Sequence, residues 1–343
     1  GNAIAEKSLL KNLFASAPLG MASSRAAWSY IEGGVPTCAA ELLRRACTYP
    51  FSRPSSSFVF HSTRTGEGRI VPFQSSDWLS LSRSAPFPSP DASNIFIKPS
   101  FSLGDLPVQA ADASQDKVFL GQELDASLLD PEGGWHPVLA IGSNAGPRQL
   151  LRKYGGEVQG WPAMDTAIVC VRIALHDYDV VYVPFTSGYG SCVATLQESR
   201  GCCVDIFVTL LSRAALQRMH FTEGGYDFVR LGAARAVVME DGETLESAST
   251  RAAESAGAPV YSYVSKKGCL CLHGGAPVSL KEIPAVARSN HACTQPEILS
   301  RLTTLCTEHR GGESAGKDVD EWIMANIEDS VARSSNNKIL EEA

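Results

Sequence analysis

The feature that most constrains the fold is a series of short apolar, strand-like runs in the middle of the chain. They are rich in Val, Ile, Leu and aromatic residues, and turn-forming residues separate most of them. Few helical segments interrupt them, so the regular alternation of a doubly wound fold is absent. This pattern predicts an α+β fold in which a curled, partly closed mixed sheet carries helices on its outside. The expected strands are residues 137–141, 167–175, 179–185, 192–196, 202–211, 226–231, 234–239, 259–264 and 269–272.

Two helices are marked by their end residues. Residues 147–154 begin with Pro147 and end just before Gly155, which is the usual asymmetry of a short helix. Ser212 is a good N-cap for a second helix over 213–220. Further helices are expected at 6–15, at 38–46, after the capping-box pattern that starts at Thr294, and at 319–329, with loose residues at the end of the chain.

The composition divides the chain into three zones. Residues 1–130 are rich in Ser and Pro and are expected to form an irregular extension packed on the main domain. Residues 131–290 hold the ordered pattern and form the main domain. Residues 291–343 are expected to form a C-terminal helix and a polar tail.

Composition and charge exclude several classes of protein. The chain has 343 residues, of which 44% are hydrophobic and 20% are charged, so it can bury a core and is not wholly disordered. With a formal net charge of −7, it has no global electrostatic reason to bind nucleic acid or anionic lipid. No apolar run reaches the roughly 18–20 residues that span a bilayer. We therefore expect a soluble protein.

The ten cysteines lack the spacing of a small disulfide scaffold, and several lie inside apolar runs, so we interpret them as reduced thiols. Together with the absence of signal-peptide order in residues 1–20, this favours a cytoplasmic location. Because the chain starts at Gly1, N-terminal processing or acylation stays open.

Two segments could carry chemistry. The loop Gly142-Ser143-Asn144 joins a strand to a helix, where free backbone N–H groups suit a carboxylate or phosphate. It matches neither the P-loop nor the dinucleotide pattern, and the alternative is an ordinary strand–helix turn. Glu223 lies between a helix and a strand beside two glycines, and there it could act as a general base. The alternative is an exposed carboxylate at a helix end.

Metal sites are not expected. His220 and Glu223 could share a helix face, but no further spaced ligands accompany them. Cys269, Cys271 and His273 would lie on one face of a strand, where thiols buried in the core are the favoured interpretation over zinc ligands.

Five motifs occur in an order that resembles the γ-glutamylcyclotransferase-like superfamily. They are Ile141-Gly-Ser-Asn144, Gly190-Ser-Cys-Val-Ala-Thr195, Gly201-Cys-Cys-Val-Asp-Ile-Phe-Val, Leu216-x-x-Met219-x-x-x-Glu223 followed by Tyr226 and Arg230, and Val260-Tyr-Ser-Tyr263. The resemblance covers about residues 136–265, which is less than half of the chain. It implies a small β-barrel-like sheet with flanking helices, and an activity that needs no metal or cofactor.

The resemblance also implies roles for single residues. Glu223 would be the base that takes a proton from the substrate α-amine, and the substrate would bind at Ile141, Gly142, Ser143, Asn144, Tyr226 and Tyr261. The amine would then attack the γ-carbonyl of a small γ-glutamyl compound, such as glutathione, and release 5-oxoproline. Such an enzyme is a lyase or acyl transferase of glutathione metabolism.

Two departures from the family pattern keep other functions open. Ile141 stands where the family has Tyr, and residues 1–130 lie outside the pattern and could cap or reshape the pocket. The alternatives are a non-catalytic binding or scaffold module that retains the fold, and a hydrolase or acyl transferase that reuses the same pocket.

Overall fold

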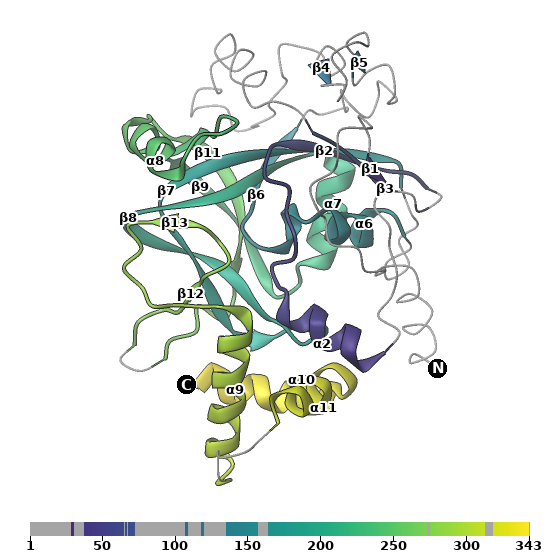
Figure 1. Ribbon diagram of the computed structural model, residues 1–343, viewed down its shortest axis with the longest axis vertical. Helices are drawn as coiled ribbons and strands as arrows, with labels where there is room; N and C mark the ends of the chain where they lie inside the picture. Colours follow the sequence, from purple (N-terminus) through teal and green to yellow (C-terminus); the bar gives the residue numbers. More distant parts are fainter. Residues whose placement is uncertain are drawn as a thin grey trace.

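The computed structural model describes residues 29–30, 38–64, 66, 68–72, 107–108, 118–119, 135–156, 164–272, 275–312 and 318–342. Its centre is a mixed sheet of twelve strands, with helices on the outside (Figure 1). The expected α+β class is confirmed. The sheet is not closed, because β1 and β9 lie at its two ends.

Two long strands dominate the sheet. β7 (Thr166–Thr186) and β8 (Cys192–Leu211) pair antiparallel along almost their whole length. The sequence predicts four shorter strands here, and this is wrong. The polar residues in the middle form a bend in a continuous hairpin, where Asp177 adopts a φ of 68° and its Oδ1 accepts the Gly201 N–H at 2.9 Å.

The remaining strands extend the sheet on both sides of this hairpin. Its order is β1-β3-β2-β7-β8-β6-β11-β9, in which only β6 and β11 pair in parallel. These strands are β1 (Ser29–Tyr30), β2 (Phe58–Ser62), β3 (Gly68–Pro72), β6 (His136–Ala140), β9 (Tyr226–Ala234) and β11 (Ala258–Ser265). β2 belongs to the expected N-terminal extension, yet it pairs with β7. The sheet therefore includes residues on both sides of the expected boundary near residue 130.

Short strands complete the described structure. They are β10 (Ala236–Val238), β12 (Ser279–Leu280), β13 (Ala285–Val286) and β14 (Ala292–Cys293) in the main sheet, and the separate pair β4 (Pro107–Val108) and β5 (Val118–Phe119). The strand expected at 269–272 does not form. Cys271 makes only an isolated bridge, to Pro277.

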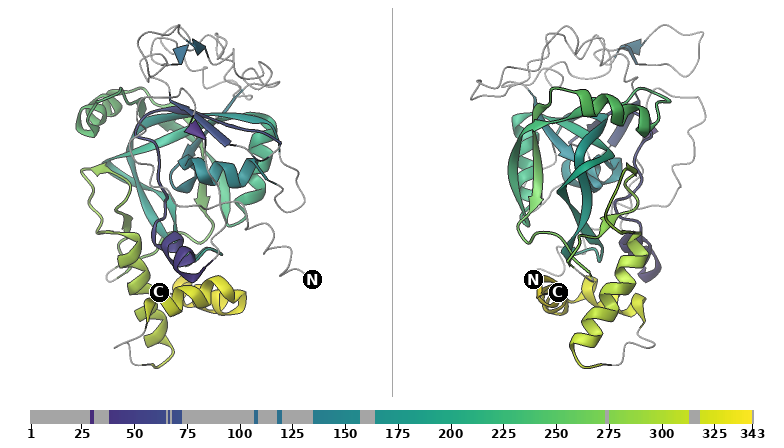
Figure 2. Two further views of the ribbon diagram at one scale, coloured as in Figure 1. Left: turned by 45° about the vertical axis from the view of Figure 1, so that its right-hand side comes forward. Right: turned by 90° about the vertical axis from the view of Figure 1, so that its left-hand side faces the viewer.

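The described helices lie outside the sheet. They are α2 (Ala39–Cys47), α6 (Pro147–Tyr154), α7 (Arg213–Thr222), α8 (Leu245–Glu254), α9 (Gln295–His309), α10 (Val319–Glu328) and α11 (Ser330–Glu342), together with the short 3-10 turn η3 (Ser143–Ala145). Helices α2, α9, α10 and α11 gather at one end of the molecule, while α6 and α7 lie side by side against the sheet (Figure 2). The capping box at Thr294 is confirmed.

Two helices differ from the expectation. The sequence did not indicate α8, and the residues expected to be loose at the chain end form α11, so that prediction is wrong. Asn337 of α11 accepts the Thr186 N–H at 2.8 Å, a contact that ties the helix to the end of β7. The helix expected at 6–15 lies outside the described residues.

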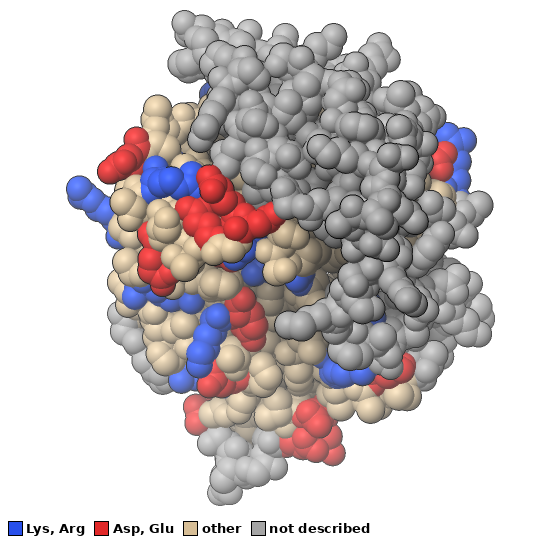
Figure 3. Space-filling view, turned by 45° about the horizontal axis from the view of Figure 1, so that its top comes forward, with Lys and Arg blue, Asp and Glu red and all other residues tan. Residues whose placement is uncertain are grey.

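Charge and helix length bear on the expected partner classes. On the face drawn in Figure 3, acidic and basic side chains are interspersed over the described surface. Among the helices of the described ranges, none has the length and apolar character needed to cross a membrane.

Gly190 allows α10 to approach the β7–β8 turn closely. Its φ is 83°, and an added Cβ would lie 2.9 Å from Cγ1 of Ile327 and 3.0 Å from Cγ2 of Ile323. Both the backbone conformation and the contact with α10 therefore require glycine.

We predict that Gly190→Ala lowers the free energy of unfolding by about 2–4 kcal/mol, because it adds backbone strain to a steric clash. The matched control is Gly188→Ala, since a Cβ there would meet nothing within 4 Å. Urea unfolding followed by circular dichroism measures both variants. Equal stability of the two variants would contradict the prediction.

Asp177 is expected to make the hairpin bend sensitive to acid. Burial acts to raise its pKa, but the Gly201 N–H and the Arg235 guanidinium outweigh it and lower the pKa from 3.8 to about 2. A depressed carboxyl pKa stabilises the fold above the unfolded value and loses this effect as the pH falls through the folded value. We predict that Asp177→Asn costs about 1 kcal/mol at neutral pH, allowing for solvent screening, and nothing below about pH 2. Urea unfolding of both proteins across this pH range tests it.

Candidate active site

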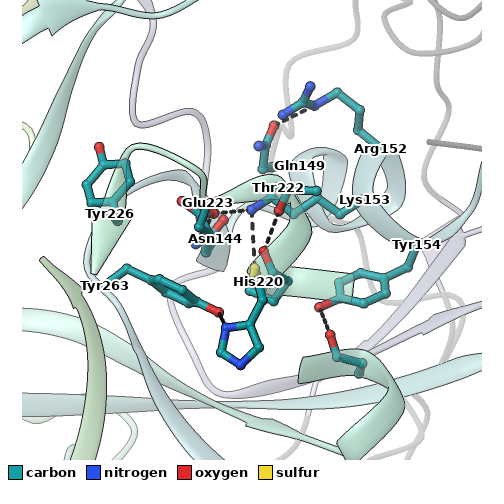
Figure 4. Close-up of polar contacts among 12 residues, drawn as sticks. Asn144, Gln149, Arg152, Lys153, Tyr154, His220, Thr222, Glu223, Tyr226 and Tyr263 are labelled. Atoms are coloured by element: carbon teal, nitrogen blue, oxygen red, sulfur yellow. Dashed lines mark hydrogen bonds and ion pairs between the residues drawn. The ribbon is translucent and has the colours of Figure 1, made fainter. Parts of the chain in front are cut away.

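The two segments singled out in the sequence meet in the structure. Asn144, in the loop between β6 and α6, donates a hydrogen bond from Nδ2 to Oε1 of Glu223, which directly follows α7, at 3.2 Å. Figure 4 shows that the Asn144 and Glu223 side chains meet, and both residues line a cavity of about 230 Å³. Residues 79 positions apart thus contribute to one site.

Helix ends and two tertiary contacts hold these segments in place. Ser212 Oγ accepts the Ala215 N–H at 3.2 Å and so caps α7, and Pro147 occupies the first turn of α6. Tyr154 on α6 donates its hydroxyl to the Ala215 carbonyl of α7 at 3.0 Å. The buried guanidinium of Arg218 on α7 donates to the backbone carbonyl of Lys153. The two helices are therefore fixed relative to each other next to the cavity.

Lys153 forms a buried ion pair with Glu223. Its Nζ contacts Oε1 of the carboxylate and lies 3.2 Å from Sδ of Met219, and the two charged side chains are 2% and 13% exposed. Burial lowers the pKa of Lys153, an effect that Glu223 partly opposes. Asn144 and Lys153 both bind Oε1, so within the described chain Oε2 of Glu223 keeps no hydrogen-bond partner. One oxygen is anchored and the other is available to a ligand.

A tyrosine from the N-terminal zone reaches the loop. The hydroxyl of Tyr49 accepts the Ala194 N–H at 3.2 Å, and a Cβ added to Gly142 would lie only 2.2 Å from it. Burial raises the pKa of Tyr49 well above its usual value, so the hydroxyl stays protonated and can donate. Tyr226 donates to the carbonyl of the same Ala194 at 3.1 Å. A phenol thus lies at the loop although Ile141 occupies the position directly before Gly142.

The structure brings together six of the seven residues predicted for the site. Those that line the cavity are Ile141, Gly142, Ser143, Asn144, Glu223 and Tyr226.

Tyr261 is the one predicted site residue that lies elsewhere. Its ring stacks on Phe228 with centroids 4.8 Å apart, and it does not line the cavity. β11 runs parallel to β6 with Tyr261 level with Val138, so Tyr263 lies nearer the end of β6 where the loop begins. Tyr263 does line the cavity, and its hydroxyl lies 2.8 Å from Nδ1 of His220.

Several residues that line the cavity were not predicted from the sequence. Arg152 and Lys153 stand in the last turn of the helix that follows the glycine loop, and this position was a signal that could have identified them. Tyr49 and Tyr189 reach the cavity only through tertiary contacts, for which the sequence holds no local signal.

Metal ligands and a second cavity are the other features that could form a site. No group of three or more His, Cys, Asp or Glu side chains in the described ranges is arranged to hold a metal ion. A larger cavity of about 530 Å³ lies beside residues 47–55, but its Arg172 and Asp205 pair with each other at 2.6 Å. Of the predicted site residues, none lines it, so we place the candidate site in the smaller cavity.

Comparisons of the chain with protein-family models, with curated proteins and with solved structures found no match. The function is therefore inferred from the residues of the cavity.

The buried pair should be strongly coupled. We predict that Lys153→Met lowers stability by about 2–4 kcal/mol, because the Glu223 carboxylate loses its ammonium partner while it stays largely buried. Glu223→Gln in the same background should recover part of this loss. A double-mutant cycle by urea unfolding should give a coupling energy of about 1–3 kcal/mol. Additive effects of the two substitutions would show that the pair contributes no coupling.

Proposed function

We propose that this protein is a cyclotransferase-like enzyme that needs no cofactor and releases 5-oxoproline from a γ-glutamyl compound, with Glu223 as general base. We also propose that its sheet is a variant of the γ-glutamylcyclotransferase-like fold. One observation carries the proposal. The Glu223 carboxylate, anchored through only one oxygen, lines the same cavity as the Gly142–Asn144 loop.

The arrangement fits the chemistry of the reaction. At neutral pH the α-ammonium of a γ-glutamyl compound is not a nucleophile, so a base must first remove a proton. In the proposed reaction, Oε2 of Glu223 takes this proton and the free amine attacks the γ-carbonyl carbon of the same molecule. The new C–N bond closes the ring, and the ring nitrogen then loses its second proton. The old amide C–N bond breaks, and the leaving nitrogen takes up the two protons and departs as an ammonium. Because attack is intramolecular, the cavity mainly has to orient the substrate.

Hydrogen-bond donors are available for the oxygen that becomes negative during attack. The Tyr49 hydroxyl accepts from Ala194, and its own proton is not engaged by any described residue. The backbone N–H groups of Gly142 and Ser143 make no backbone hydrogen bond within the described chain. Preorganised donors of this kind stabilise a developing oxyanion.

One observation favours the second candidate, a non-catalytic binding module. Lys153 lies directly on the carboxylate that should act as base, and its positive charge opposes the approach of a substrate ammonium. A module of this kind would bind a small ligand in the same cavity without turnover.

The test is an assay of 5-oxoproline and amine release over a panel of γ-glutamyl peptides and amides. We predict that Glu223→Gln lowers the turnover number about 10²- to 10⁴-fold, because it removes the base while keeping the size of the side chain. Glu246→Gln is the matched control, since Glu246 is exposed on α8 and does not line the cavity. It should keep full activity.

Two outcomes would overturn the proposal. Unchanged turnover in Glu223→Gln would remove Glu223 as the base. No turnover by the wild type on any member of the panel, combined with saturable binding of the same compounds, would favour the binding module.

A further inference from the structure

The charges that line the cavity do not balance. Among the described lining residues, only Arg152, Lys153 and Glu223 carry a formal charge. Lys153 and Glu223 neutralise each other as an ion pair. The guanidinium of Arg152 is therefore left as the net charge of the cavity wall.

Arg152 has only a neutral partner. Its Nε donates to Oε1 of Gln149 at 3.1 Å, one turn earlier on α6 (Figure 4). In the described chain, no carboxylate lies within ion-pair distance of it. A guanidinium held in a cavity wall without an anion is a good binding site for a carboxylate, which it can bind through two parallel hydrogen bonds.

A second guanidinium strengthens the positive field. Arg45 is buried, and its Cζ lies 4.7 Å from the ring centroid of Tyr189, which lines the cavity. Burial lowers the pKa of Arg45 to about 10, and the charge of Arg152 contributes to this lowering. The two guanidinium groups therefore repel each other, and an anion bound at Arg152 would relieve that repulsion.

We propose that Arg152 forms a carboxylate-binding subsite of the cavity. This inference rests on the proposed function, and it specifies the substrate as a γ-glutamyl compound whose α-carboxylate is free. Arg152 and Lys153 are neighbours in the chain, and Lys153 holds Glu223. The α-carboxylate and the α-amine are likewise attached to one carbon atom, so Arg152 binds the first group while Glu223 receives the proton of the second.

The first experiment measures binding without turnover. The probes are 5-oxoproline, which keeps the carboxylate, and 5-oxoprolinamide, which lacks it, titrated into the wild-type chain by calorimetry. Binding of 5-oxoproline should be about 10- to 100-fold tighter than binding of the amide. Arg152→Gln should abolish this preference, Arg152→Lys should keep part of it, and Arg213→Gln, at an exposed site on α7, should leave it unchanged. Equal binding of the two probes to the wild type would overturn the subsite.

The second experiment locates the carboxylate on the substrate. γ-Glutamyl ethylamide has only the α-carboxylate, whereas γ-glutamylglycine with its α-carboxylate converted to the amide has only the carboxylate of the leaving group. We expect Arg152→Gln to raise KM for the first compound about 10- to 100-fold with little change in kcat, which is the signature of lost substrate binding. An effect confined to the second compound would overturn the assignment to the α-carboxylate.

The experiments can refute the subsite and the proposed function independently of each other. Binding of 5-oxoproline that depends on Arg152, without turnover of any γ-glutamyl compound, would keep the subsite and refute the cyclotransferase. Turnover that depends on Glu223, with KM unchanged in Arg152→Gln, would keep the enzyme and refute the subsite.

Discussion

The long antiparallel hairpin of β7 and β8 is the constraint on which the rest of the structure depends. β2, β10 and β12 pair with β7, and β6 and β13 pair with β8, so most of the sheet is built directly on these two strands. Because β6 pairs with β8 from His136 to Ala140, the glycine loop that follows β6 leaves the sheet at a fixed point. At the other end of the hairpin, the turn with Gly190 receives α10. The position of the cavity is thus a consequence of strand pairing.

The parts that could be predicted from the sequence are those with local causes. Pro147 and Ser212 determine where α6 and α7 begin, and the apolar runs determine where the strands lie, so the loop–helix unit and the junction at Glu223 were both identified. The union of four runs into two strands was missed, because polar residues around Asp177 resemble a turn. In the structure the register of pairing shifts at this bend, and pairing continues beyond it. α11 was missed because its sequence is polar, and its contacts with β7 and α9 become visible only in the folded chain.

The electrostatics of the site could not be predicted, because they depend on which charged groups share a buried space. By its position in the sequence, Lys153 is an ordinary lysine near a helix end. In the structure it is 2% exposed and paired with Glu223. Tyr49 precedes the loop by about ninety residues in the chain, and no periodicity connects the two. Sequence motifs identified the Glu223 carboxylate and the glycine loop, whereas no motif marks Lys153 and Tyr49, which contact them.

The Lys153–Glu223 pair restricts how the proposed reaction can proceed. A substrate ammonium and the lysine both need the carboxylate, and they can be held together only because Lys153 uses Oε1 and leaves Oε2 free. Burial lowers the pKa of Lys153, and the negative charge of Glu223 raises it. When Glu223 gains a proton this charge is lost, so the pKa of Lys153 falls. The lysine then releases a proton more readily, so either Glu223 or Lys153 can donate a proton to the leaving amine. In this scheme Lys153 belongs to the proton-transfer machinery, and the observation that most favours a non-catalytic module also fits an acid–base pair.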